Sequence, residues 1–509
     1  MTNYIQLGQA AINSRNTTEA VHWFEKAVDK NPQDAQALAC LGQTLCWANL
    51  QKQGLTYLHK AGKQLIKSAR KSKNTQHLLA MAEQLQFWND YPSSLELVKQ
   101  AVQINKKDVR GFQILAHTYA RLNNNKLALL ASQQAVNKAP ENVALNIQQA
   151  TLEAKNGQHD TAIKRLQKIL ERPASNEELF RTHKELALVL DKTKQYHQVF
   201  NHLYSASTLA QSLPEVKKQN PSFVTDLLKT YTTGFTKELI HHCCKLNPVD
   251  NYSDPVFLIG FLRSGTTLTQ EILDTHSDTF ISDETDLIFS LREELGRINN
   301  KKGTTPEQLK NITTEQIKHL RQFYWNRAIN KHGEEITNKL LIDKTTMNTF
   351  DVGLINCIFP NAKVIFVMRD PRDVCLSCFM QIMVPTPTTI HLLSWGKTIN
   401  LYAQTMTWWM HIRKEMSLDF IEFRYEDAIT DFETTFRKTF NFLDLEWTSK
   451  ANDFHKHASK KFIASPSFNQ VSQPLYSSSL ARWKHYETEF SPVTNQLLPF
   501  IKAFNYQQN

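Results

Sequence analysis

The sequence lacks the long apolar runs and the cysteine pattern that would place the chain in a membrane or outside the cell. Its longest apolar stretches, such as Val364–Met368, are far shorter than the roughly 20 residues of a membrane-spanning helix. The N-terminus has neither a basic start nor an apolar segment, so we expect no signal peptide. Seven cysteines, an odd number in a long chain, indicate no disulfide framework. These absences predict a cytoplasmic protein.

Acidic residues are fewer than basic ones, 49 against 59, which gives a net charge of +10. This excess favours an anionic ligand, a membrane surface or nucleic acid, and does not choose among them. The contents of hydrophobic (41%) and charged (21%) residues are typical of globular proteins. At 509 residues the chain is too long for one ordinary core, so two or three domains are expected.

The first 210 residues repeat with a period of about 34 residues. Small and large residues recur in the same order in six units, with a slip of a few residues after the second unit. The first unit contains Tyr4, Leu7, Gly8, Ala11, Ala20, Phe24, Ala27 and Pro32, and the second contains Leu38, Leu41, Gly42, Leu45, Gly54, Leu58 and Ala61. This order resembles the tetratricopeptide repeat. It predicts an all-α solenoid over residues 1–210, in which small residues let paired helices approach closely.

Solenoids of this kind bind peptides or proteins in their groove, or brace a neighbouring domain, and both roles stay open here. Residues 211–250 are predicted to be a helical connector with one helix over Phe223–Leu246. Within it, the adjacent residues His241–Cys244 resemble a set of metal ligands. Side chains at four consecutive helical positions point in different directions, so we interpret them as helix surface and core.

From residue 251 onward the pattern changes to alternating strands and helices, which predicts an α/β domain with a parallel sheet over residues 251–509. The predicted strands are 256–259, 340–342, 364–368 and 420–423. The predicted helices are 290–298, 314–331, 350–359, 374–380, 392–415 and 432–443. Ligands of such sheets bind beyond the carboxyl ends of the strands, so functional residues are sought there.

A phosphate-binding loop follows the first predicted strand. Gly260 and Gly265 frame a Walker A spacing, but Thr266 stands where that motif has lysine. The backbone N–H groups of residues 264–267, at the start of a helix, are expected to face an anion. The domain is therefore predicted to be P-loop-like, with a ligand that does not need the Walker lysine.

Other polar residues follow further predicted strands. Arg369 comes just after one strand and Ser377 lies on the next helix, which suits a second phosphate group. Lys344 and Tyr425 end two other strands. Cys375 and Cys378 have a redox spacing, which we interpret as packing thiols because no other redox feature is present.

Three motifs taken together resemble the sulfotransferases that use 3′-phosphoadenosine 5′-phosphosulfate (PAPS), and most closely the tyrosylprotein sulfotransferases. They are RSGTT at 263–267, RDPRD at 369–373 followed by Ser377, and YEDAI at 425–429. The acidic turn at 282–285 and the late segment SFNQV at 467–471 fit the same resemblance. A tetratricopeptide solenoid in front of it resembles a bacterial-type arrangement.

The resemblance implies which residues hold PAPS. The 5′-phosphosulfate is expected at the RSGTT loop, the 3′-phosphate at Arg369 and Ser377, and the nucleoside beside Tyr425. The segment 467–476, with Arg482, is expected to close over the cofactor. The loop residues concerned are Arg263, Ser264, Gly265, Thr266 and Thr267. Two anion sites without a Walker lysine fit the separate phosphate groups of PAPS better than the triphosphate of ATP.

The resemblance also implies the catalytic groups. Glu284 is expected to be the general base, because it lies 21 residues after Arg263 (284 − 263) as in the family. Lys344 and Ser467 match the residues that stabilise charge on the bridging oxygen, and Arg263 helps to orient it. No metal is expected. The family's second arginine, twelve residues beyond Arg369, is replaced here by Gln381.

The predicted activity is sulfuryl transfer to an acceptor hydroxyl, with a tyrosine of a peptide or protein as the leading acceptor. A carbohydrate or small-molecule acceptor is the first alternative, and an inactive scaffold whose repeats capture a protein partner is the second. A nucleotide kinase is disfavoured by Thr266 and by the lack of a clear magnesium-binding acid. Neither a nucleic-acid partner nor a membrane span is expected.

Overall fold

The computed structural model describes residues 3–246, 248, 250–459, 471, 473, 475 and 479–507. The chain forms two compact units. The first contains Met1–Arg172 and Ile329–Glu334, and the second contains Pro173–Ala328 and Glu335–Asn509. None of the helices in the described ranges has both the length and the apolar character needed to cross a bilayer.

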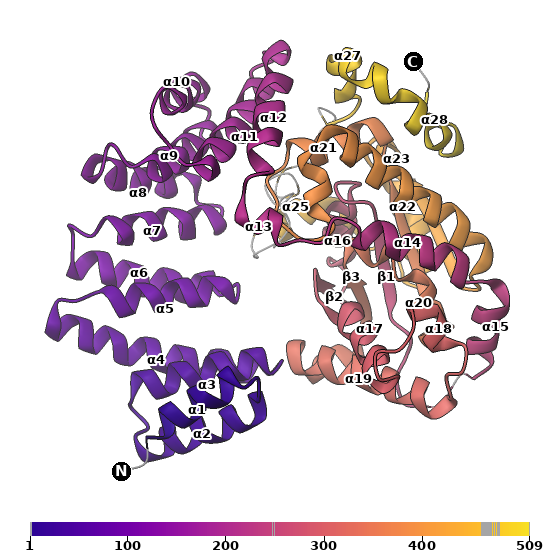
Figure 1. Cartoon of the computed structure of the whole chain (residues 1–509), viewed down its shortest axis with the longest axis horizontal. Coiled ribbons are helices and arrows are strands. Elements are labelled where there is room, and N and C mark those ends of the chain that lie inside the picture. The colour runs from indigo at the N-terminus through magenta and orange to yellow at the C-terminus, as the bar shows by residue number, and fades with distance from the viewer. Residues whose placement is uncertain are drawn as a thin grey trace. The chain divides into compact units, whose positions relative to one another are not determined.

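Six helix pairs occupy the N-terminal part, one for each predicted repeat, so the predicted solenoid is confirmed. In the first unit, α1 to α10 follow one another in stacked pairs (Figure 1). The pairs are α1 (Tyr4–Asn13) and α2 (Thr17–Lys30), α3 (Ala35–Trp47) and α4 (Gln51–Ser72), α5 (Gln76–Phe87) and α6 (Tyr91–Ile104), α7 (Val109–Arg121) and α8 (Asn125–Lys138), α9 (Val143–Lys155) and α10 (His159–Leu170), and α11 (Asn176–Lys192) and α12 (Tyr196–Ala210).

Close helix contact explains the small residues of the repeat. A Cβ atom on Gly54 would lie 2.5 Å from the carbonyl oxygen of Gly42, so α3 and α4 approach through bare backbone. Short polar side chains begin many of the helices; Asp34, for example, accepts hydrogen bonds from the N–H groups of Gln36 and Ala37. The 22 residues of α4 make it the longest of these helices, which accounts for the slip in the repeat after the second unit.

The last helix pair, α11 and α12, belongs to the second compact unit and packs against α21 (Pro371–Met380). Phe200 on α12 contacts Phe379, Trp395 and Tyr486 ring to ring. The buried ammonium group of Lys184 on α11 donates a hydrogen bond to the carbonyl oxygen of Phe379. This pair is therefore part of the same hydrophobic packing as the α/β fold.

The connector contains α13 (Pro214–Lys217), α14 (Phe223–Gly234) and α15 (Lys237–Lys245). The prediction of a single helix over Phe223–Leu246 is wrong, because Phe235 adopts an extended conformation (ψ 91°) and Thr236 caps a new helix. The Phe235 ring fills the space above Gly353, where a Cβ atom would lie 2.7 Å from it. Tertiary packing of this ring, which the local sequence does not reveal, accompanies the break.

Five parallel strands form the sheet, in the order β2-β3-β1-β4-β5, which confirms the predicted parallel α/β fold. The strands are β1 (Val256–Gly260), β2 (Thr279–Asp283), β3 (Leu340–Lys344), β4 (Lys363–Met368) and β5 (Asp419–Arg424). The sequence analysis missed β2, because its second half is polar and was interpreted only as the acidic turn. Asp283 at its end pairs in register with Lys344.

Helices cover both faces of the sheet (Figure 1). On one face, Leu258 and Ile365 pack against the helices that carry Leu268 and Phe436. On the other face, the ring of Phe366 stacks on a tryptophan of α22 with 3.9 Å between centroids. The helices not yet named are α16 (Thr266–Leu273), α17 (Leu287–Ile298), α18 (Thr305–Leu309), α19 (Thr314–His332), α20 (Val352–Ile358), α22 (Trp395–Glu415), α23 (Tyr425–Thr430), α24 (Phe432–Phe442), α25 (Phe454–Ala458), α27 (Glu487–Phe490) and α28 (Thr494–Ala503).

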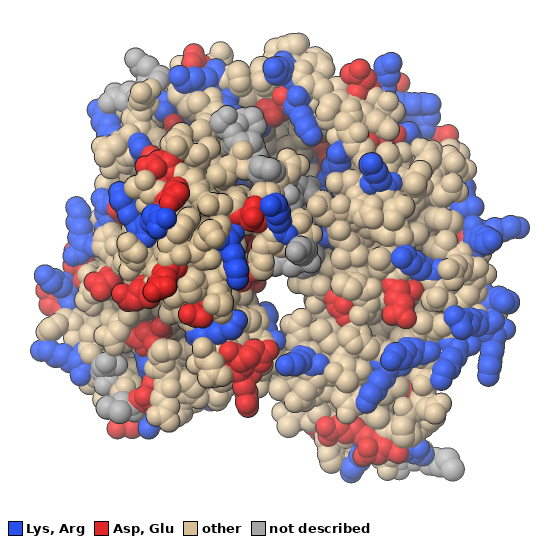
Figure 2. All heavy atoms as spheres, turned by 180° about the vertical axis from the view of Figure 1, so that it is seen from behind, with Lys and Arg blue, Asp and Glu red and all other residues tan. Residues whose placement is uncertain are grey.

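Basic side chains do not form one continuous surface on the face shown in Figure 2. They are scattered over it, with acidic side chains between them in many places. A protein that neutralises a long polyanion normally collects its lysines and arginines in a patch or stripe. Figure 2 shows one face only, so the expectation of no nucleic-acid partner stays a prediction.

We predict that replacing Lys184 with methionine changes the pH dependence of stability. Burial lowers the pKa of Lys184 to about 7, from 10.5 in the unfolded chain. Between these values the unfolded state binds more protons, so the stability of the wild type rises with pH across this window, whereas below pH 7 both states are protonated. Relative to Lys184→Met, the wild type should gain about 2–4 kcal/mol from pH 7 to pH 10. Urea unfolding followed by circular dichroism at both pH values measures this, and parallel pH profiles would contradict it.

Candidate active site

The loop between β1 and α16 is held in a conformation that suits few residues. Arg263 and Gly265 have left-handed backbone angles, with φ of 67° and 109°. A Cβ atom on Gly265 would lie 2.5 Å from the Cδ2 atom of Tyr425, so the tyrosine ring rests directly on this glycine. The N-terminus of α16 follows at once, and the N–H groups at a helix N-terminus favour an anion.

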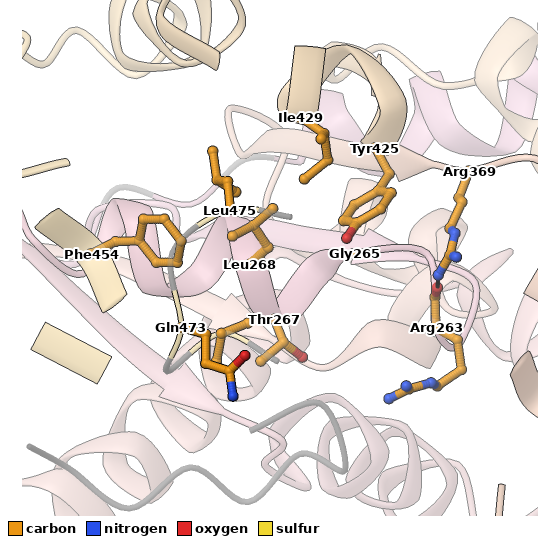
Figure 3. A pocket seen from close by; sticks show the side chains of 11 residues that line it. Arg263, Gly265, Thr267, Leu268, Arg369, Tyr425, Ile429, Phe454, Gln473 and Leu475 are labelled. Atoms are coloured by element: carbon orange, nitrogen blue, oxygen red, sulfur yellow. Dashed lines mark hydrogen bonds between the residues drawn. The ribbon is translucent and has the colours of Figure 1, made fainter. Parts of the chain in front are cut away.

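A cavity opens beside this loop (Figure 3). Its cationic side chains, Arg263 and Arg369, lie at one end, and apolar side chains including Phe454 and Leu475 lie at the other. The guanidinium carbon of Arg369 lies 4.9 Å from the centre of the Tyr425 ring. The lining residues are Arg263, Gly265, Thr267, Leu268, Arg369, Tyr425, Ile429, Phe454, Val471, Gln473 and Leu475. Such a cavity suits a ligand with an anionic part and an apolar part.

The two predicted anion-binding clusters meet at this cavity. The Nε atom of Arg263 donates a hydrogen bond to Ser377 Oγ at 3.1 Å. The Nη1 atom of Arg369 donates to the carbonyl oxygen of Arg263 at 3.3 Å. The structure therefore brings residues 263–267 and 369–377 together, although Arg263 and Ser377 are 114 positions apart in the chain.

Two buried polar atoms of this site have no hydrogen-bond partner within the described ranges. They are the Oγ atom of Ser264, a residue 1% exposed, and the Nε atom of Arg369, which is 8% exposed. Leaving such atoms unpaired costs about 1–3 kcal/mol each. Arg369 lines the cavity, so an anion bound there would satisfy its Nε atom, and the residues present fit a phosphate group of PAPS.

Contacts that the sequence analysis missed orient Arg369 and Tyr425. The Nη2 atom of Arg369 donates to the carbonyl oxygen of Ser479 at 2.6 Å, and Ser479 Oγ lies 3.1 Å from the Tyr425 hydroxyl. Asp373 lies 3.9 Å from Arg369. Burial raises the pKa of Asp373, and the charge of Arg369 opposes that rise. Asp373 belongs to the RDPRD motif, but no pattern in the sequence points to Ser479.

Glu284 and Lys344 form an ion pair where β2 and β3 end. The Nζ atom of Lys344 donates to Glu284 Oε1 at 2.6 Å and to Asp283 Oδ1 at 3.1 Å. Lys344 is fully buried, whereas the Glu284 side chain is 36% exposed. Burial alone would lower the pKa of Lys344, but the charges of Glu284 and Asp283 outweigh it and raise that pKa. The lysine is therefore charged at neutral pH.

Hydroxyl groups link this ion pair to the loop. The Oγ1 atoms of Thr266 and Thr346 lie 3.0 Å apart, and Thr346 Oγ1 donates to Glu284 Oε1 at 3.4 Å. The hydroxyl groups of Thr266 and Thr346 therefore connect the loop to the Glu284 carboxylate. The sequence analysis missed Thr346, although its place just after Lys344, at a strand end, was a usable signal.

The lining of a second cavity includes Thr285 and Thr345, which follow Glu284 and Lys344 in the chain. It has an empty volume of about 2120 Å³, and α14, α17 and the segment after β3 contribute to its lining. Its exposed aromatic residues are Phe223 and Phe289, which are 38% and 53% exposed. Met347, Phe350 and Pro387 add further apolar surface, and Arg292 and Asp351 form an ion pair at the wall. The sequence analysis did not predict this cavity.

Some predicted site residues lie elsewhere. Arg482 is not among the residues that line the first cavity; its Nη2 atom donates to Asp191 Oδ2 on α11 at 2.6 Å. Ser467 lies outside the described residues, whereas Val471, Gln473 and Leu475 from the same predicted segment line the cavity. Both Cys375 and Cys378 are buried, and burial raises the pKa of each thiol, which agrees with the packing interpretation. Within the described ranges, no cluster of three or more His, Cys, Asp or Glu is arranged to hold a metal.

Family profiles match both parts of the chain. The profile of the sulfotransferase family matches residues 255–449, which contain the loop, the ion pair and both anion-binding clusters. Residues 255–449 form a sulfotransferase domain. A tetratricopeptide-repeat profile matches residues 2–34, ahead of the sulfotransferase domain.

Individual proteins are similar to longer or shorter parts of the chain. An uncharacterized protein of Aquifex aeolicus (strain VF5) is 26% identical over 452 residues, which cover 86% of this chain and 56% of that protein. The protein-tyrosine sulfotransferase of Drosophila melanogaster is 28% identical over 251 residues, 45% of this chain and 46% of its own. The chain thus spans about half the length of these two relatives. A solved structure, the sulfotransferase domain from the Synechococcus PCC 7002 olefin synthase, covers 51% of this chain and 98% of its own at 17% identity and a TM-score of 0.36.

We predict that Lys344→Met destabilises the sulfotransferase domain. The substitution leaves Glu284 and Asp283 side by side without their buried counter-charge, and their partial exposure moderates the loss. The free energy of unfolding should fall by about 2 kcal/mol. Lys339→Met, an exposed position just before β3, removes the same charge and should change it by less than about 0.5 kcal/mol. Equal effects of the two substitutions in urea unfolding would show that the ion pair has no structural importance.

Proposed function

We propose that the protein transfers a sulfuryl group from PAPS to the hydroxyl group of a tyrosine in a peptide or protein. The observation that carries this proposal is the single cavity lined by both Arg263 and Arg369, where the buried Nε atom of Arg369 has no hydrogen-bond partner among the described residues. A donor with two separate anionic groups matches it. The named similarity to a protein-tyrosine sulfotransferase supports the tyrosine acceptor.

In this proposal different residues of the chain bind different parts of the donor. The backbone N–H groups of 264–267, the hydroxyls of Ser264, Thr266 and Thr267, and Arg263 bind the 5′-phosphosulfate. Arg369 and Ser377 bind the 3′-phosphate, and Tyr425 lies against the nucleoside. Arg482, expected from the sequence to contact the donor, acts here through the C-terminal segment that it anchors to Asp191. PAPS, when bound, supplies the activated sulfuryl group.

Glu284 is the proposed general base. Its partly exposed carboxylate lies next in the chain to Thr285 of the second cavity, and in this proposal it accepts the proton of the acceptor hydroxyl. Lys344, charged and fully buried, stabilises the negative charge that grows on the leaving oxygen, and Arg263 and Ser467 assist it. The contact with Lys344 holds the Glu284 carboxylate in place before the acceptor arrives.

The second cavity is the proposed acceptor site. Its lining includes the exposed rings of Phe223 and Phe289, against which the ring of a tyrosine can pack. Its volume exceeds that of one aromatic ring, so it has room for the residues around a tyrosine. An inactive scaffold is disfavoured because Arg263, Glu284 and Lys344 are all present at the site.

We further propose that the division into a repeat region (1–210), a connector (211–250) and a catalytic region (251–509) is functional. The repeats bind a peptide or protein partner, as the tetratricopeptide match at 2–34 supports. A cytoplasmic location is part of the same proposal.

Replacing Glu284 with glutamine should abolish transfer and leave donor binding intact. The amide cannot take the acceptor proton, so we expect kcat with a tyrosine peptide and labelled PAPS to fall by at least about 100-fold. Calorimetry with 3′,5′-ADP should give a dissociation constant within about twofold of the wild type, because Glu284 is not among the residues lining the donor cavity. Glu446→Gln, on an exposed loop, is the matched control. Undiminished turnover by Glu284→Gln would exclude this residue as the base.

Replacing Phe289 with alanine should weaken the binding of the acceptor and leave the binding of the donor unchanged. Loss of this aromatic wall is expected to raise the KM for a tyrosine peptide about fivefold, with the KM for PAPS unchanged. Phe87→Ala removes an even more exposed ring from α5 of the repeats and should leave both constants unchanged. If Phe87→Ala raised the acceptor KM and Phe289→Ala did not, the acceptor site would lie in the repeats.

A further inference from the structure

One face of α11 carries two buried polar contacts with the sulfotransferase fold. Lys184 and Asp191 are seven residues apart (191 − 184), two helical turns, and so lie on the same face. Both belong to the compact unit that contains the sheet. Neither is explained by the packing of repeat against repeat, because both contact residues beyond 370.

Asp191 fixes the C-terminal segment that follows residue 479. Its carboxylate accepts hydrogen bonds from Arg482 Nη2 and from the Tyr486 hydroxyl, each at 2.6 Å. The rings of Tyr196 and His485 stack beside it with 4.1 Å between centroids. The Asp191 and Arg482 side chains are only 14% and 25% exposed, so this ion pair is shielded from solvent more than a surface pair.

The same segment reaches the donor cavity at its other end. Ser479 accepts a hydrogen bond from Arg369 through its carbonyl oxygen, and its hydroxyl lies beside that of Tyr425. Between these ends, the Trp483 N–H group donates to Asp373 Oδ1 at 2.9 Å. The 479–486 segment therefore connects Asp191 on α11 to Arg369 and Tyr425, which line the cavity.

Lys184 provides a second connection, through α21. Its ammonium group contacts the Phe379 carbonyl oxygen at the C-terminal end of this helix, where the helix dipole favours a cation. Two residues earlier on α21, Ser377 accepts the hydrogen bond from Arg263. The end of the helix that carries the proposed 3′-phosphate residue is thus anchored to α11.

We propose that α11, the first helix of the last repeat, sets the affinity of the sulfotransferase domain for its donor. Asp191 and Lys184 are positioning residues: they touch no donor atom, and they hold the 479–486 segment and α21 so that Arg369, Tyr425 and Ser377 are preorganised. The inference rests on the proposed donor site. It gives the repeats a role in catalysis beyond recruiting a partner.

Donor affinity measured on the full chain tests this directly. For Asp191→Asn we expect the dissociation constant of 3′,5′-ADP, by calorimetry, to rise about tenfold, because a loosened segment must be ordered on binding. The KM for PAPS should rise equally, and kcat at saturating PAPS should stay within about twofold. Glu177→Gln, an exposed residue of the same helix, is the charge-matched control and should change nothing. Unaltered donor binding by Asp191→Asn would overturn the inference.

A double-mutant cycle separates positioning from general stability. If Asp191 acts through Arg482 and Tyr486, then Asp191→Asn should weaken 3′,5′-ADP binding by only about threefold when Arg482→Ala is already present, because only the Tyr486 contact is left to lose. Fully additive losses would contradict the proposed connection. Should Asp191→Asn fail to fold, Tyr486→Phe removes only one of the two contacts, and we expect about threefold weaker binding; wild-type binding by this variant would overturn the inference.

The outcomes also distinguish this inference from the proposed function. A wild-type chain that does not bind 3′,5′-ADP removes the donor site itself, and the inference with it. A wild-type chain that binds, with Asp191→Asn binding equally well, leaves the sulfotransferase proposal intact and removes only the role of α11.

Discussion

The hydrogen bond from Arg263 Nε to Ser377 Oγ joins two parts of the chain that the sheet brings together. Strands β1 and β4 are neighbours, with Gly260 paired in register with Val367, so the loops that follow them must leave the sheet side by side. A parallel sheet permits this because all its carboxyl ends lie on one edge. The proposed donor site depends on that register, since a slip of β4 by one residue would reverse the side from which Arg369 leaves the strand.

The order of the strands also orders the proposed chemistry. Glu284 and Lys344 follow β2 and β3, the RSGTT loop follows β1, Arg369 follows β4, and Tyr425 follows β5. Along the edge of the sheet, the ion pair therefore comes first, the loop second, and the residues proposed for the 3′-phosphate third. The buried ammonium group of Lys344 anchors one end of this row, and the contact of Arg369 with Ser479 anchors the other.

Much of this arrangement was accessible from the sequence, because it depends on local signals. Apolar runs marked four strands, and polar residues at their ends marked the loop, Lys344, Arg369 and Tyr425. Strand β2 was not predicted, because positions that pair with β3, such as Asp283, are polar. Their pairing with β3 is a long-range contact that the local sequence does not show. Ser479 and Asp191 were not predicted for a related reason. Each acts by a hydrogen bond to a partner more than a hundred residues away in the chain. Such contacts leave no periodicity in either segment.

Calorimetric comparison of nucleotides on the full-length wild-type chain tests the central claim most directly. If two separate anionic ends are held by the clusters at 263–267 and 369–377, then 3′,5′-ADP should bind at least about tenfold more tightly than 5′-AMP, which lacks the second phosphate. ATP with magnesium should bind no better than 5′-AMP, because the loop has no Walker lysine. Tighter binding of magnesium–ATP than of 3′,5′-ADP would contradict the account.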